Sequence, residues 1–252
     1  MTKPKRPAAG VFVEEELVEG QSLVLPEAPS HYLRNVMRKS VGDVIGLFNG
    51  RSPEYAAAVS KVGKKAVEVD LGAVVAPFEP VDRLTLLFSP IKRSPMELLI
   101  AKATELGITD FQPVLMEHTQ SERMKIERLV SIAVEAAEQC ERLTVPTFHD
   151  AMPLKMAVEG FDGSVGAALE TSEFKPLRSV LDHIESFQGL MVGPEGGFSA
   201  DEIAWLTKQP KVVGLGLGPR ILKAETAGIA LVSIYQALKG DWHKLPDFRG
   251  PE

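Results

Sequence analysis

The sequence predicts an α/β protein with a small β-rich N-terminal part and a larger C-terminal part built on a mostly parallel sheet. Short apolar or alternating runs separated by turn residues fill the first part, which is typical of β-strands. From Leu84 onward, apolar runs alternate with segments of helical periodicity, and this order favours a parallel sheet covered on both faces. Pro77 and Pro80 bracket a short connection, so we expect domains at residues 1–78 and 79–252.

The first part is expected to hold five strands and one helical insert. The insert is predicted at residues 30–36, with Ser30 as its N-cap. The expected strands are residues 11–13, 23–25, 44–48, 55–59 and 66–71.

The second part alternates five expected strands with four expected helices. Ser94 and Glu97 predict a capping box at the start of the first helix, and Gly107 predicts its end. Ser199 and Glu202 predict a second capping box. The expected strands are residues 84–88, 111–116, 165–169, 190–192 and 212–217, and the other helices are residues 123–142, 199–207 and 223–238.

Composition favours an ordinary globular protein of the cytoplasm. The 252 residues are 44% hydrophobic and 25% charged, and no apolar run is long enough to span a bilayer. The basic N-terminus lacks the apolar core of a secretory signal. A single cysteine, Cys140, excludes an internal disulfide framework and a multi-cysteine zinc site. The five histidines have no metal-ligand spacing, so we expect no metal and no membrane partner.

Charge is unevenly distributed along the chain. The formal net charge of −6 argues mildly against a nucleic-acid partner, but residues 1–77 carry ten basic and nine acidic residues. Arg34, Arg38 and Lys39 form one of the basic clusters in this part. Such clusters are usually solvated surface, yet this one would permit local contact with phosphates.

Two glycine-containing turns are the most informative motifs. GPEGGFSADE (residues 193–202) follows one apolar run, and GPRILKAETA (residues 218–227) follows another. Ligands of open α/β sheets bind at the carboxyl ends of strands, so the two turns are candidates for two walls of one pocket. Either turn alone would be an ordinary strand-to-helix connection. Together, with Glu195, Arg220 and Glu225 embedded in them, they favour a binding site.

Nucleotide-binding motifs do not account for these turns. Gly214, Gly216 and Gly218 resemble a dinucleotide-binding fingerprint only superficially. The third glycine of the fingerprint is not correctly spaced, and the motif lies at the end of the domain and not in its first βαβ unit. The sequence contains no Walker A motif, which removes support for phosphoryl transfer from a nucleotide.

Motifs along nearly the whole chain resemble the ribosomal RNA small subunit methyltransferase E family of the SPOUT superfamily. VGPEGGFSADE and LGLGPRILKAETA are similar to its C-terminal signature. The upstream segments that resemble the family, in the same order, are HYLRNVMRKSVGD (residues 31–43), KRSPMELLIAKATELG (residues 92–107) and EAAEQCERLTVP (residues 135–146).

The resemblance implies a fold and an activity. Residues 1–78 would form a PUA-like β-barrel that contacts RNA, and residues 79–252 a SPOUT domain with a trefoil knot. The protein would act as a homodimer, with S-adenosylmethionine as methyl donor and no metal. It would methylate N3 of a specific uridine in the decoding region of 16S rRNA, in the small ribosomal subunit.

Apolar walls and close backbone approach suit the adenine and thioether parts of that cofactor. Glu195 would favour the sulfonium or a ribose hydroxyl, while plain core packing is the alternative for the leucines. The expected cofactor-binding residues are Leu169, Val192, Gly193, Glu195, Gly196, Leu215, Leu217, Gly218 and Leu222.

Methylation at N3 requires loss of a proton and stabilisation of the charge left on the ring. Arg220 is the candidate to stabilise this charge, and Glu225 is the candidate proton acceptor, with helix capping as an equal alternative for Glu225. Arg34, Arg38 and Lys39 are the candidate RNA contacts. A non-catalytic RNA-binding or ribosome-assembly protein, and an α/β enzyme using another nucleotide, remain the competing interpretations.

Overall fold

The chain forms two compact units in the computed structural model, which describes residues 5–120, 124–169, 187–245 and 249. Unit 1 consists of Met1–Pro80, Ala137–Val145 and Pro246–Glu252, and unit 2 of Val81–Ala136 and Pro146–Leu245. The units differ from the expected contiguous domains at 1–78 and 79–252, because Ala137–Val145 and Pro246–Glu252 are grouped with the N-terminal residues. No helix in the described part of the chain is long and apolar enough to cross a membrane.

Unit 1 is built on a five-stranded mixed sheet with the order β1-β3-β4-β5-β2. Its strands are β1 (Gly10–Phe12), β2 (Ser22–Val24), β3 (Val44–Phe48), β4 (Glu54–Val62) and β5 (Val67–Ala76). β1 runs parallel to β3, and the other pairs are antiparallel. All five expected strands are present, and β4 and β5 are longer than their apolar patterns predicted. Buried residues of the sheet, including Ile45, Leu47 and Val69, form a core of their own.

The helical insert begins earlier than predicted, and Ser30 is not its N-cap. α1 spans Glu27–His31 and continues as a π-helical turn, η1, over Tyr32–Val36. Ser30 lies inside α1, where its buried hydroxyl donates to the Leu25 carbonyl (2.9 Å) and accepts from the Val67 N–H (3.0 Å). The prediction was wrong because this hydroxyl bonds α1 to the sheet instead of capping a helix end.

A buried ionic cluster joins four distant segments of unit 1. The carboxylate of Glu54 is fully buried and accepts from Arg6 Nε at 2.8 Å, while its other oxygen pairs with Arg249 Nη2 at 2.5 Å. The Arg249 backbone N–H donates to Glu141 Oε2 at 2.7 Å. Burial lowers the pKa of Arg249 below its ordinary value, and the facing Glu54 carboxylate opposes this shift.

Two glycines make room for this cluster in the sheet. A Cβ at Gly10 would overlap the guanidinium of Arg249, and a Cβ at Gly46 would overlap the carboxylate of Glu54. Both glycines lie on paired strands, where Gly10 is opposite Gly46. The absence of side chains at these two positions is therefore a packing requirement of the ion pairs.

Unit 2 contains a seven-stranded sheet in which every pair is parallel. The order is β12-β10-β11-β6-β7-β8, and β9 also pairs with β7. The predicted mostly parallel sheet is confirmed. The strands are β6 (Thr85–Phe88), β7 (Asp110–Leu115), β8 (Thr147–Phe148), β9 (Met152–Pro153), β10 (Ser164–Ala168), β11 (Phe187–Val192) and β12 (Val212–Leu215).

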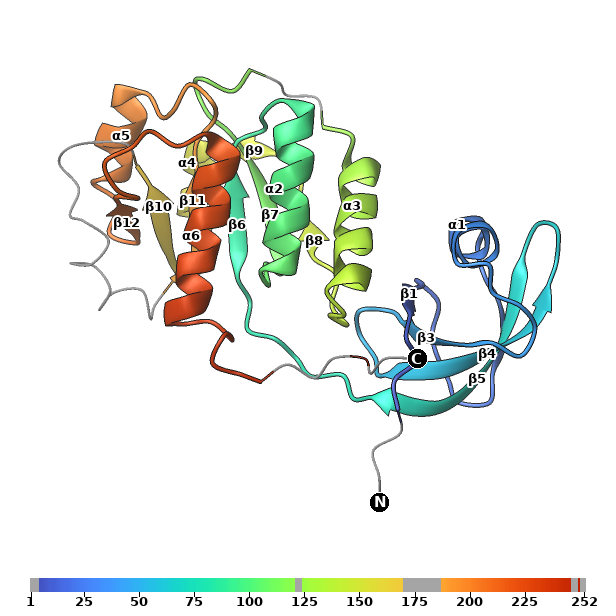
Figure 1. Cartoon of the computed structure of the whole chain (residues 1–252). Coiled ribbons are helices and arrows are strands. Elements are labelled where there is room, and N and C mark those ends of the chain that lie inside the picture. The colour runs from blue at the N-terminus through green and yellow to red at the C-terminus, as the bar shows by residue number, and fades with distance from the viewer. Residues whose placement is uncertain (1–4, 121–123, 170–186, 246–248, 250–252) are drawn as a thin grey trace. The chain divides into compact units, whose positions relative to one another are not determined.

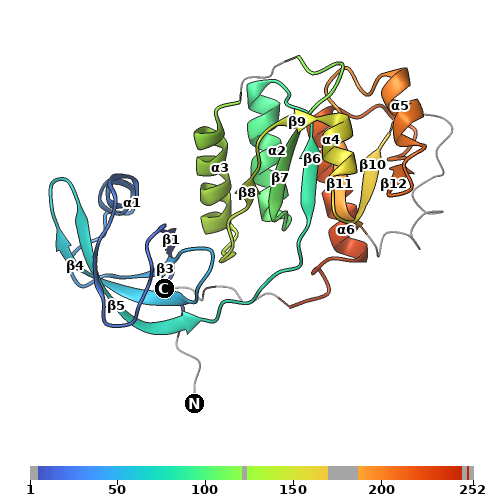
Figure 2. The same ribbon diagram turned by 180° about the vertical axis from the view of Figure 1, so that it is seen from behind.

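Helices cover both faces of this sheet, as Figures 1 and 2 show from opposite sides. α2, α3 and α6 pack on one face, and α4 and α5 on the other. The short elements β8, β9 and α4 were not expected from the sequence. The helices span Arg93–Glu105 (α2), Ile126–Gln139 (α3), Leu154–Glu159 (α4), Ala200–Leu206 (α5) and Ala224–Leu238 (α6).

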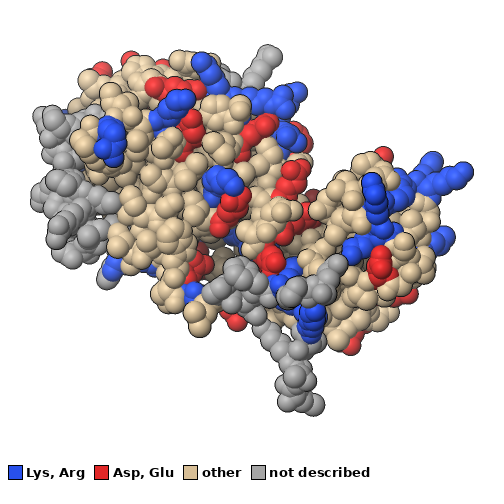
Figure 3. All heavy atoms as spheres, in the orientation of Figure 1, with Lys and Arg blue, Asp and Glu red and all other residues tan. Residues whose placement is uncertain are grey.

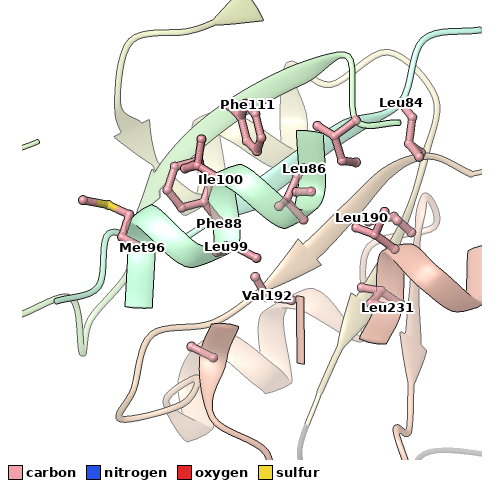
Figure 4. Packing of buried hydrophobic residues seen from close by; sticks show 14 of the residues in the cluster. Leu84, Leu86, Phe88, Met96, Leu99, Ile100, Phe111, Leu190, Val192 and Leu231 are labelled. Atoms are coloured by element: carbon pink, nitrogen blue, oxygen red, sulfur yellow. The ribbon is translucent and has the colours of Figure 1, made fainter. Parts of the chain in front are cut away.

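Successive strand residues of unit 2 enter two different cores. Leu86 and Phe88 pack with α2 and α6, as Figure 4 shows, whereas Leu87 between them packs on the face of α4 and α5. Leu190 and Met191 of β11 divide in the same way. This alternation follows from the two-residue period of a strand that is buried on both faces.

One of the two predicted capping boxes is present. Ser199 accepts from the Glu202 N–H, and the Glu202 side chain accepts from the Ser199 N–H, at the start of α5. The box at Ser94 and Glu97 was wrong, because α2 begins at Arg93 and its N-cap position is Lys92. The carboxylate of Glu195, from the first glycine turn, accepts from the Lys92 N–H instead.

We expect Arg249→Met to destabilise unit 1 by about 3–5 kcal/mol, because it leaves buried carboxylates short of a cation. Urea-dependent hydrogen exchange of the amides in β3 to β5 measures this free energy. Lys61→Met is the matched control in the same unit, since the Lys61–Glu68 pair is exposed and such pairs contribute about 0–1 kcal/mol. Equal effects of the two substitutions would contradict a structural role for the buried cluster.

Asp110, at the start of β7, is held ionised by its neighbours. Burial raises the pKa of Asp110, but hydrogen bonds from Arg83 (2.9 Å), His149 (2.8 Å) and Thr109 (2.8 Å) outweigh it and lower the pKa below its ordinary value. A lowered folded-state pKa contributes stability above the unfolded-state value, and this contribution is lost as the pH falls through the folded-state pKa.

Asp110→Asn should therefore destabilise unit 2 at neutral pH and progressively less as the pH falls below the ordinary carboxyl value of 3.8. Urea midpoints measured between pH 7 and pH 3 test this, with Asn at the exposed Asp162 as the control. A destabilisation by Asp110→Asn that stays constant over this range would show that the ionised carboxylate contributes nothing.

Candidate functional site

A pocket of about 390 Å³ opens in unit 2 where β10 and β12 end. The two strands are neighbours, with Ala168 paired to Leu215, so the segments that follow them face each other. The second glycine turn supplies most of the lining. The lining residues are Ala168, Leu169, Leu215, Gly216, Leu217, Gly218, Pro219, Arg220, Ile221, Leu222 and Ala227.

The pocket changes from apolar to charged between its buried part and its rim. Leu169 and Leu215 are buried at 3% and 1% exposure, and they form the inner part. Arg220 and Ile221 are exposed lining residues. Gly218 adopts a φ of +99°, and no described atom lies within 4 Å of the position a Cβ would take. Glycine is thus needed there for its backbone conformation and not for space.

The structure brings together five of the expected cofactor-binding residues in this pocket: Leu169, Leu215, Leu217, Gly218 and Leu222. The other four do not line it. Val192 is buried in the core beside α2 and α6, and Gly193 packs against the ring of Phe198. Of the two turns, the second lines this pocket, whereas the first follows β11, whose Val192 pairs with the pocket-lining Ala168.

Glu195 of the first turn reaches the start of α2. Its Oε1 accepts from the Lys92 N–H at 2.9 Å, which satisfies a backbone donor at the N-cap of that helix. A carboxylate is well placed there because the N-terminus of a helix carries partial positive charge.

Three consecutive residues after β7 fasten the surroundings of the first turn. The Glu117 N–H donates to Glu202 Oε1 at 2.8 Å. His118 Nδ1 lies 3.1 Å from the carbonyl oxygens of both Gly196 and Gly197. The hydroxyls of Thr119 and Ser89 are 2.8 Å apart and share a hydrogen bond. The carboxyl ends of β6, β7 and β11 are thereby connected.

The two candidate catalytic residues occupy different positions. Arg220 lines the pocket, whereas Glu225 is half-buried in the first turn of α6 and is not a lining residue. The N-cap of α6 is Lys223, whose own side chain makes no capping hydrogen bond. Within the described residues no hydrogen-bond partner of the Glu225 carboxylate is found, so it is available to interact with the helix dipole or with a ligand.

The basic cluster of unit 1 is organised by Arg34. Its Nη1 donates to the Gly63 carbonyl at 3.1 Å and also to the Lys64 carbonyl, so η1 is fastened to the β4–β5 hairpin. Arg38 is exposed and adopts a left-handed φ of +54°, and Lys39 is half-buried. Figure 3 shows Lys and Arg side chains gathered over α1 and this hairpin.

Sequence reasoning did not identify the contacts of His118, Ser89 or Lys92. A lone histidine between two polar residues carries no spacing signal, and a backbone donor such as the Lys92 N–H leaves no trace in the residue type. Only the folded sheet places these groups beside the first turn.

Two family models match most of the chain. Residues 78–236 match an RNA methyltransferase domain, and residues 25–72 match an RNA methyltransferase PUA domain. An α/β unit with a pocket at its strand ends, preceded by such a domain, defines the class: this protein is an RNA methyltransferase.

Full-length relatives narrow the class further. The chain is 32% identical over 228 residues to ribosomal RNA small subunit methyltransferase E of Rickettsia conorii, covering 88% of this chain and 93% of the relative. It is 30% identical to the Bacillus subtilis protein of the same name, covering 91% and 97%. The chain belongs to the ribosomal RNA small subunit methyltransferase E family.

A solved structure of the same family has a similar fold. The protein from Neisseria gonorrhoeae, bound to S-adenosyl methionine, superposes with a TM-score of 0.81 at 26% identity. The superposition covers 93% of this chain and 99% of that one.

We expect Glu202→Ala to destabilise unit 2 by about 1–2 kcal/mol, because the carboxylate accepts from the N–H groups of both Ser199 and Glu117. Urea unfolding followed by the fluorescence of Trp205, which lies in α5, measures the change. Asp201→Ala is the control at the neighbouring position, where the side chain is exposed. A Glu202→Ala effect no larger than the control would mean that α5 is held by its apolar contacts alone.

Proposed function

We propose that this protein transfers the methyl group of S-adenosylmethionine to N3 of a specific uridine in the decoding region of 16S rRNA. The proposal rests above all on the pocket at the ends of β10 and β12, with Arg220 among its lining residues, in a chain of this family. The N. gonorrhoeae relative, bound to S-adenosyl methionine, supports the choice of cofactor.

The pocket fits the chemistry of this cofactor. Its 390 Å³ lies within the range of about 300–1,000 Å³ typical of small-molecule sites. Leu169, Leu215 and Leu217 offer apolar surface to adenine and to the thioether chain, and the backbone around Gly218 offers hydrogen-bonding groups without a side chain in the way. When bound, S-adenosylmethionine supplies an electrophilic methyl group.

Two side chains are assigned to the reaction at the base. Arg220 would stabilise the negative charge that develops on the uracil ring when N3 loses its proton. Glu225, in the first turn of α6, would accept that proton. The dipole of α6 favours the ionised form of this carboxylate, which is the form that a proton acceptor needs.

Unit 1 is assigned to binding of the RNA. Arg34, Arg38 and Lys39 lie in the part of the chain that is not net negative. Arg34 is hydrogen-bonded to the β4–β5 hairpin, and Figure 3 shows basic side chains over α1 and this hairpin. Phosphate contacts of this kind give affinity and position without reading the base sequence.

The finer architecture follows the same assignment. The proposal includes a five-stranded sheet closed as a PUA-like β-barrel and a trefoil knot in unit 2. It also includes a homodimer, a cytoplasmic location and a reaction that uses no metal ion. Light scattering at micromolar concentration tests the dimer, because a mass close to the 27.4 kDa of one chain would contradict it.

Two other functions make different predictions in binding experiments. A non-catalytic RNA-binding or assembly protein would bind 16S rRNA but give no heat with S-adenosylmethionine or its demethylated product. A different α/β enzyme would bind NAD or ATP in the same pocket. Calorimetry of the folded protein with each of these compounds separates the three functions.

Arg220→Ala should lower methyl transfer by roughly two or more orders of magnitude while both ligands still bind, the size typical of removing a charge-stabilising donor. Single-turnover transfer to purified small subunits measures this, and the nucleoside profile of the 16S rRNA identifies the product.

The comparison variant neutralises Arg34, Arg38 and Lys39 together. It should weaken RNA binding and flatten its salt dependence, with unchanged cofactor affinity. Near-normal transfer by Arg220→Ala would show that Arg220 has no part in the chemistry.

A further inference from the structure

The first glycine turn is a segment that needs external support. Residues 193–197 include three glycines, which lose more backbone entropy on ordering than any other residue type. Within the turn, the Gly197 N–H donates to the Pro194 carbonyl at 2.9 Å. Side-chain bonds to the turn come from Glu195, through the Lys92 N–H, and from His118, which reaches it from the loop after β7.

We propose that His118 is a positioning residue that holds residues 193–197, which begin directly after Val192 beside the pocket-lining Ala168, in the backbone conformation that the bound cofactor requires. This inference rests on the proposed function. Nδ1 of His118 lies 3.1 Å from the carbonyl oxygens of Gly196 and of Gly197. Carbonyl oxygens only accept, so Nδ1 carries the proton and donates to both. One ring nitrogen thereby fixes the orientation of two successive peptide groups, and a turn ordered in advance binds its ligand at a lower entropic cost.

Gly196 has no side chain because the imidazole packs there. A Cβ at Gly196 would lie 3.0 Å from Cβ and 3.4 Å from Cγ of His118, closer than nearly all ordinary contacts of that atom. Gly197 is different: its φ is +70°, and no described atom lies within 4 Å of a Cβ placed there. Gly196 therefore fits His118, whereas Gly197 fits a left-handed backbone.

Calorimetric titration of purified protein with S-adenosylmethionine tests the inference through three single variants. His118→Ala should raise the Kd by roughly 3–30-fold, the size of one or two lost hydrogen bonds. His118→Asn should bring the Kd back to within about threefold of wild type, because the amide nitrogen of Asn occupies nearly the place of Nδ1 and donates as it does. His31→Ala, at an exposed histidine of unit 1, is the control and should leave the Kd unchanged. Urea midpoints should stay the same in all three variants, because His118 is exposed and acts locally.

The pairing of His118 with Gly196 is tested by a double-mutant cycle. Gly196→Ala should raise the Kd in the wild-type background but add little in the His118→Ala background, where the imidazole is absent. An equal effect of Gly196→Ala in both backgrounds would show that position 196 must be bare for the ligand itself, and would overturn the pairing.

Other outcomes distinguish a failure of the positioning role of His118 from a failure of the proposed methyltransferase function. A wild-type Kd for His118→Ala overturns the positioning role. A loss of affinity that His118→Asn does not restore, accompanied by a lower urea midpoint, overturns it as well. Normal binding with lost methyl transfer in His118→Asn would assign the ring to proton transfer instead and would also overturn it. If the wild-type protein gives no heat with S-adenosylmethionine, the proposed function fails, and the inference fails with it.

Discussion

Parallel pairing of every strand in unit 2 is the constraint on which its other features depend. Strands that all run one way need connections that return across a face of the sheet, which is why helices lie on both faces. The same constraint delivers the carboxyl ends of β6, β7, β10, β11 and β12 to one edge. The pocket lies at this edge, and so do the bonds between Lys92 and Glu195 and between His118 and Gly196, whose partners are far apart in sequence.

Unit 1 depends on a different kind of interaction. Its ionic cluster places Glu54, Arg6 and Arg249 where water cannot solvate them, and such burial is unfavourable unless each charge is paired and hydrogen-bonded. Hydrogen bonds from the Arg249 backbone to Glu141 and from its side chain to the Pro7 carbonyl meet part of this requirement. The members of the cluster come from four distant segments, so their charges are paired only when these segments meet in the folded unit.

Local patterns predicted those features that arise from neighbouring residues. The buried apolar run of β3 and the reciprocal bonds of Ser199 and Glu202 depend on local sequence, and both were predictable. Ser30 was misread because a buried serine that bonds to a strand has the same local sequence as a cap. The N-cap of α2 was misplaced because its partner, Glu195, belongs to another turn.

In the candidate site, too, local sequence predicted some features, whereas contacts between distant segments determine others. A strand, a glycine turn and a helix together predict the second turn as a pocket wall, and the expected residues Gly218, Arg220 and Leu222 of that turn line the pocket. The first turn differs because its side-chain bonds lead to loops after β6 and β7. Those partners carry no periodicity and no motif, so one sequence cannot indicate them.

Membership of Arg249 in unit 1 has a consequence for how the protein is made. N-terminal domains generally fold first as a chain is synthesised. Here Glu54 of the N-terminal sheet lacks one of its two buried counter-ions until residue 249 has left the ribosome, after the whole parallel sheet of unit 2 has emerged. Nascent chains thus carry a unit 1 whose ionic cluster is complete only after Arg249 has emerged.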